Sequence, residues 1–111
     1  MKTLIRITVM TAALLLPASM ASAADVATNY TKNCASCHGK DGSGKTKMGK
    51  KSGARDYRDA KVQASFSDAE GAKAIKDGVK KDGKEKMKAY GSKFSSSEIS
   101  ALVKYIRGFK K

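Results

Sequence analysis

The stretch Cys34-Ala35-Ser36-Cys37-His38 organises the rest of this 111-residue chain. The cysteines are three residues apart and the histidine follows directly, so one helical turn presents all three side chains on one side. Two sulfurs placed in this way can bond the two vinyl groups of a porphyrin, and the imidazole can ligate its iron. The chain contains no other Cys or His. The spacing therefore predicts one covalently attached c-type haem, held by Cys34 and Cys37, with His38 as an iron ligand.

Other uses of two closely spaced cysteines fit the sequence less well. A thioredoxin-like redox pair needs a strand and a crossover helix around the motif, and no strand pattern lies nearby. A structural zinc site needs four ligands, whereas the chain offers three, packed too tightly to surround one ion. A simple disulfide leaves the adjacent histidine unexplained.

The first 23 residues have the pattern of a secretory signal peptide. A basic start precedes an apolar run over 7–16, which is too short to span a bilayer, and Ala21-Ser22-Ala23 is a cleavage triplet. We therefore expect a signal at 1–23 and one mature domain at 24–111, exported to the periplasm.

The charge of the chain is strongly unbalanced, with 23 basic and 10 acidic residues. Removal of residues 1–23 takes away two basic and no acidic residues, which leaves 21 against 10, a net charge of +11. Such a surface favours an acidic partner or peripheral contact with an anionic membrane, and export argues against nucleic acid. The alternative is that the lysines only keep the surface solvated.

Apolar spacing and turn residues predict the helices. Residues 25–38 are expected to form a first helix, capped by Asp25, that buries Tyr30 in the core. The glycine-rich segment 39–64 is predicted to be a loop. A capping box, Ser67 to Glu70, opens a short helix with an apolar side that ends at Gly78, and residues 80–86 are predicted to be a polar loop. The apolar side comprises Ala72, Ile75 and Val79.

The last helix has the clearest pattern in the sequence. Ser95 and Glu98 form a second capping box, and Phe94 and Ile99 can pack as a hydrophobic staple across the start of the helix. An apolar stripe continues to a stop at Gly108, and its members are Ile99, Leu102, Val103 and Ile106. Residues 24–111 show no convincing alternation with a period of two, so the predicted fold class is all-α.

The second axial ligand of the iron cannot be another histidine of this chain, which leaves a methionine, a lysine, water or an open site. Once the signal is removed, Met48 and Met87 remain as thioether candidates. Met87 is preferred because it lies 49 residues after His38, between two predicted helices, where a loop can return across the opposite face of the ring. A Met/His ligand pair raises the reduction potential. Otherwise each methionine only fills space in the core.

Four matched segments make the chain resemble a small monohaem class I cytochrome c. They are Tyr30, the run from Cys34 to Gly39, the run from Met87 to Gly91, and the terminal stretch 102–107. The resemblance covers nearly all of residues 25–109. It implies three main helices around one haem, with the first and last helices crossing near Tyr30 and either Leu102 or Tyr105.

The expected function is one-electron transfer between extracytoplasmic redox partners, not enzymatic catalysis. The partner is expected to be an acidic redox protein or a membrane redox complex, and the carrier a monomer. Two alternatives stay open: an open iron site, as in a peroxidase or gas sensor, and a fixed subunit of a larger dehydrogenase or oxidase. Candidate contacts for the haem propionates are Arg55, Tyr57 and Gln63. Candidate docking lysines are Lys40, Lys45, Lys47, Lys86 and Lys88.

Overall fold

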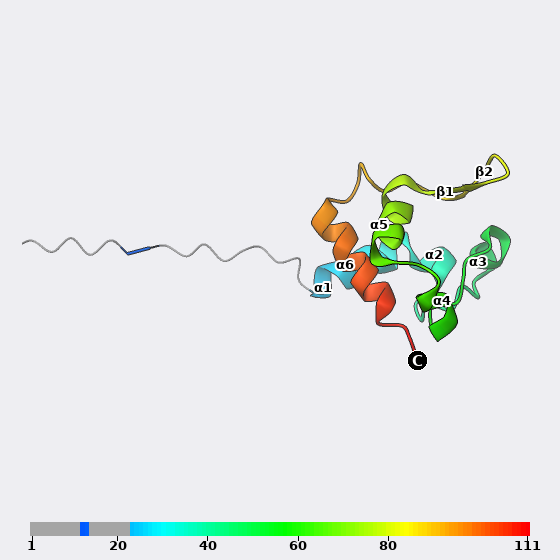
Figure 1. The fold of residues 1–111 in the computed structure, drawn as a ribbon, viewed down its shortest axis with the longest axis horizontal. Coiled ribbons are helices and arrows are strands. Elements are labelled where there is room, and N and C mark those ends of the chain that lie inside the picture. Colours follow the sequence, from blue (N-terminus) through cyan, green and yellow to red (C-terminus); the bar gives the residue numbers. More distant parts are fainter. Residues whose placement is uncertain (1–11, 14–22) are drawn as a thin grey trace, which may run out of the picture.

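The computed structural model describes residues 12–13 and 23–111, and this part of the chain is rich in helix (Figure 1). None of its helices is long and apolar enough to cross a membrane. Most of the predicted signal peptide, residues 1–11 and 14–22, lies outside the described residues. In chain order the elements are α1 (Ala23–Asn33), α2 (Ala35–His38), α3 (Lys47–Ser52), α4 (Ala60–Ala64), α5 (Asp68–Asp77), β1 (Val79–Lys81), β2 (Lys84–Met87) and α6 (Ser96–Arg107).

The first helix begins earlier than predicted and is interrupted. It starts at Ala23, so Asp25 lies inside its first turn and does not cap it, although a carboxylate there still favours the helix dipole. The chain leaves regular helix at Cys34 and resumes as the single turn of α2. The attachment motif therefore occupies a short turn of its own at the end of α1.

The core lies where α1, α5 and α6 pack together, and α6 crosses α1 (Figure 1). Tyr30 and Leu102 are the most deeply buried large side chains, with 1% and 0% of their surface exposed. The Tyr30 ring packs against the rings of Tyr105 and Phe109, with centroids 4.9 Å and 5.3 Å away. Tyr30 is thus a core residue, and the crossing involves both Leu102 and Tyr105, as expected.

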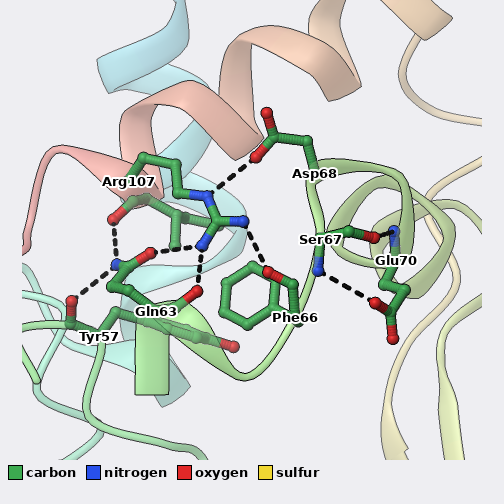
Figure 2. Close-up of polar contacts among 8 residues, drawn as sticks. Tyr57, Gln63, Phe66, Ser67, Asp68, Glu70 and Arg107 are labelled. Carbon is green, nitrogen blue, oxygen red and sulfur yellow. Dashed lines mark hydrogen bonds and ion pairs between the residues drawn. The ribbon is translucent and has the colours of Figure 1, made fainter. Parts of the chain in front are cut away.

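Both predicted capping boxes are present. The Ser67 hydroxyl accepts from the N–H of Glu70, whose carboxylate accepts from the N–H of Ser67, as Figure 2 shows. Ser95 and Glu98 make the same reciprocal pair at the start of α6. Each box satisfies backbone donors that the first turn of a helix leaves unpaired. Phe94 and Ile99 are both buried beside the second box.

The segment 39–64 is more ordered than predicted, because it contains α3 and α4. Thr46 caps α3 and also donates to the carbonyls of Ser36 and Cys37, at 2.7 Å and 2.9 Å. A Cβ at Gly49 would lie only 2.1 Å from the Cys37 carbonyl oxygen, so the glycine allows α3 to pack directly against α2. Neither short helix has the long apolar periodicity from which helices are predicted.

The segment after α5 forms a β-hairpin, so the prediction of a polar loop over 80–86 is wrong. Strands β1 and β2 pair antiparallel, with Val79 opposite Met87 and Lys81 opposite Lys84. The turn between them is Asp82-Gly83, and both residues have positive φ, 54° and 74°, as a type I′ turn requires. The described part of the chain is therefore helix-rich, with one short hairpin in addition to its helices. The described residues form six helices, of which α1, α5 and α6 have ten or more residues.

Candidate haem site

An apolar cavity of about 260 Å³ opens between α2, α5, α6 and the hairpin. It is lined mainly by aliphatic and aromatic side chains, with one charged residue of each sign. The lining residues are His38, Arg55, Tyr57, Phe66, Glu70, Gly71, Ala74, Ile75, Val79, Met87, Val103 and Ile106. The wall contributed by α5 includes the small residues Gly71 and Ala74, and the Phe66 ring lies against Gly71.

His38 ends α2 and lies against the ring of Tyr57, with the centroids 5.3 Å apart. Burial lowers the pKa of the imidazole, so the ring is neutral at neutral pH and can offer a lone pair to a metal. Its Nδ1 is buried and has no hydrogen-bond partner within the described residues.

The turn that carries His38 is fixed from two sides. The Tyr30 hydroxyl donates a 2.6 Å hydrogen bond to the carbonyl of Gly39, the residue after the histidine. Burial raises the pKa of this hydroxyl, so it stays a donor. On the other side, the N–H of Gly44 bonds the His38 carbonyl at 2.8 Å.

The two predicted attachment residues are both free thiols. Cys34 is buried in the core cluster, and burial raises the pKa of its thiol to about 11. Cys37 lies in α2 and is partly exposed. Neither is among the residues that line the cavity, although His38, which follows Cys37 directly, is.

Met87 lines the same cavity as His38, and tertiary contacts hold it there. Met87 pairs with Val79 in the hairpin, and a Cβ at Gly78 would lie 2.6 Å from the Met87 carbonyl oxygen, so only glycine permits this approach.

Tyr90, three residues after Met87, fixes the segment from the other side. The Tyr90 N–H donates to the Ile75 carbonyl at 2.9 Å. The Tyr90 hydroxyl also donates to the carbonyl of Asn33, next to Cys34, at 2.9 Å. The methionine segment is thus joined to both α5 and the end of α1.

Met48 occupies a very different position. It lies on α3 with 51% of its surface exposed, and it does not line the cavity. Of the two candidate methionines, the structure brings only Met87 together with His38.

The three candidates for propionate contacts also differ in whether they line the cavity. Arg55 and Tyr57 line the cavity, whereas Gln63 does not. The Gln63 side chain is buried elsewhere, where its amide nitrogen donates to the carbonyls of Tyr57 and Ile106 at 2.7 Å and 2.9 Å. The Gln63 side chain therefore lies outside the cavity, with its amide nitrogen bonded to backbone carbonyls and its side-chain oxygen bonded to Arg107.

Sequence reasoning did not identify several residues of the wall. Phe66 lines the cavity and directly precedes Ser67, the first residue of a capping box. That position was its only signal in the sequence. Val79 was expected on the apolar side of the helix that ends at Gly78 and lies in β1, whereas Ile106 lies on the expected apolar stripe of α6, and both line the cavity. Arg107, which binds the segment behind Phe66, had no signal in the periodicity at all.

Helices packed around an apolar cavity, with a C-x-x-C-H turn supplying a neutral histidine to it, define a c-type cytochrome. The chain belongs to the family described as cytochrome C oxidase, cbb3-type, subunit III, whose model matches residues 21–106. It is a small class I c-type cytochrome, and membership implies haem c and a role in electron transfer.

Solved structures that are similar to the chain include the following two. One is the KustC0563 c-type cytochrome, with 38% sequence identity, a TM-score of 0.69, and coverage of 77% of this chain and 96% of the other. The second is a tyrosine-to-phenylalanine mutant of the same cytochrome, with 36% identity, a TM-score of 0.68, and coverage of 78% and 99%. No curated protein matches the chain.

The residues present fit a haem. The cavity lining is largely apolar, the imidazole is neutral, and the two thiols beside it are unpaired. Arg55 adds one positive charge to the lining, where a propionate would find a partner.

Proposed function

We propose that the protein is a one-electron carrier with a single covalent haem c, ligated by His38 and Met87. The observation that carries the proposal is that these two side chains, 49 residues apart in the chain, line one cavity. A neutral imidazole and a thioether are a ligand pair that stabilises ferrous iron and raises the reduction potential. When bound, the haem supplies the redox chemistry by cycling its iron between the ferric and ferrous states.

The chain's own residues have separate tasks in this proposal. Cys34 and Cys37 hold the ring covalently, and Arg55 and Tyr57 are the proposed partners of its propionates. The apolar wall keeps water away, which lowers the local dielectric and favours the less charged ferrous state. Because His38 and Met87 are both held by backbone contacts on either side, they need not move when the charge changes.

We further propose that the carrier acts in the periplasm and docks on an acidic redox protein or a membrane redox complex. Support comes from the charge of residues 24–111, which is +11, and from the lysines near the motif and the hairpin. Lys40, Lys45, Lys47 and Lys88 are exposed, whereas Lys86 is partly buried on β2.

The ligand assignment is tested by replacing each methionine. Met87→Ala in the exported protein should open the iron to carbon monoxide in the ferrous state and lower the reduction potential, because the thioether is lost. Met48→Ala is the matched control, since it removes the same side chain from an exposed position, and it should leave both properties as in the wild type. Absorption spectra, carbon monoxide binding and potentiometry provide the measurements.

Three outcomes would contradict the proposal. Wild-type protein without a haem that survives denaturation would refute covalent attachment. An open-site spectrum from Met48→Ala and not from Met87→Ala would reverse the ligand assignment. Rapid carbon monoxide binding by the wild type would favour an open-site peroxidase or sensor over a carrier.

A further inference from the structure

The guanidinium of Arg107, at the end of α6, binds one short segment with nearly all of its donors (Figure 2). Its Nη1 donates to the carbonyl and the side-chain oxygen of Gln63, at 2.6 Å and 2.9 Å. Nη2 donates to the Phe66 carbonyl at 2.7 Å, and Nε to the Asp68 carboxylate at 2.9 Å. All of these acceptors lie in residues 63–68, which run from the end of α4 to the first residue of α5.

The hydrogen bonds from Arg107 to uncharged groups hold the guanidinium in place more strongly than its ion pair with Asp68 does. The Asp68 side chain is 79% exposed, so water screens its attraction to Arg107 and the pair adds little. The bonds to Gln63 and Phe66 are part-buried. They depend on the flat, forked shape of the guanidinium, which lysine cannot reproduce.

Arg107 also fixes aromatic rings in a row that leads to the proposed iron ligand. Its Cζ lies 4.2 Å from the centroid of the Phe66 ring. The Phe66 ring meets the Tyr57 ring edge-on at 5.9 Å, and the Tyr57 ring lies 5.3 Å from the imidazole of His38. Phe66, Tyr57 and His38 all line the cavity.

Gln63 connects Arg107 to the same wall through the backbone. Its amide donates to the Tyr57 carbonyl and to the carbonyl of Ile106, which precedes Arg107 and also lines the cavity. Arg107 thus joins the end of α6 directly to Phe66, and through Gln63 to the backbone of Tyr57.

We propose that Arg107 is a positioning residue that closes the wall of the cavity on the His38 side and thereby sets the reduction potential. This inference rests on the proposed haem function. With Arg107 in place, Phe66 and Tyr57 pack on the His38 side of the cavity and exclude water. Looser packing admits water, which stabilises the more charged ferric state, so the potential falls.

The test is Arg107→Lys in the full haem-loaded protein, because lysine keeps the positive charge and loses the fork. We expect a lower reduction potential and an altered Soret circular dichroism signal. Lys104→Gln is the control for charge alone, since Lys104 is an exposed cation one turn earlier on α6, and it should change the potential less.

The result that would overturn the inference is a lower unfolding midpoint with wild-type potential and Soret signal, which would give Arg107 a structural role only. If Arg107→Lys yields no folded protein, Phe66→Leu decides, because it leaves the bond to the Phe66 carbonyl and removes only the ring. The same fall in potential supports the role of the wall, and an unchanged potential refutes it. Wild type without haem would instead refute the proposed function, so the two failures differ.

Discussion

At the scale of single residues, hydrogen bonds shift the pH at which a carboxyl group gains its proton. Asp56 shows this at the surface, where its carboxylate accepts from the N–H of Arg58 at 3.0 Å and from the guanidinium at 3.0 Å and 2.9 Å. These bonds hold the pKa of the Asp56 carboxyl at about 2, below its ordinary value of 3.8. Since the folded pKa is depressed, the stabilisation is complete above the unfolded value and is lost as the pH falls towards 2.

Asp56→Asn should therefore flatten the loss of stability between about pH 4 and pH 2. Denaturant unfolding across that window measures the slope, and a carboxyl titration followed by NMR in the diamagnetic ferrous protein measures the pKa directly. Arg58→Gln should give an intermediate slope, because the backbone N–H remains as a donor. A variant Asp56→Asn that loses stability as steeply as the wild type would contradict the assignment.

At the scale of elements, the hairpin is the part of the fold that presents Met87. Its turn needs positive φ at Gly83, which costs any residue with a Cβ about 1 kcal/mol or more. Gly83→Ala should loosen the hairpin and, because Met87 is paired at its far end, should raise the rate at which imidazole displaces the ligand from ferric iron. Stopped-flow absorption measures that rate.

The control is Gly53→Ala at the end of α3. Gly53 also has positive φ, 75°, and an added Cβ would meet nothing within 4 Å at either glycine. Both variants should therefore lose similar stability through backbone strain alone, while only Gly83→Ala speeds imidazole binding. Equal rates in the two variants would show that the hairpin does not control Met87.

At the scale of the whole molecule, the charge of +11 on residues 24–111 should steer the protein towards acidic surfaces. The Debye length falls from about 30 Å at 0.01 M salt to about 8 Å at 0.15 M, so the second-order electron-transfer rate with an acidic partner should fall steeply over that range. Lys47→Glu with Lys88→Glu should lower this rate more than reversal of Lys110 and Lys111 at the chain end. A flat salt dependence would mean that the lysines only solvate the surface.

The sequence by itself determined the features whose partners lie within a few residues. The motif from Cys34 to His38 and the capping boxes opened by Ser67 and Ser95 depend on local spacing, and helical geometry turns that spacing directly into contact. The core role of Tyr30 follows from the same apolar periodicity. These features could be read before any fold was known.

Only the tertiary structure decided the features that depend on the path of the chain. Met48 and Met87 carry the same thioether, and Met87 lines the cavity with His38 because Gly78 and the pairing with Val79 hold its strand next to the end of α5. Likewise, Arg107 finds its acceptors about forty residues earlier in the chain. Contacts over such separations have no periodic signal in the sequence, because they form only after the helices have packed.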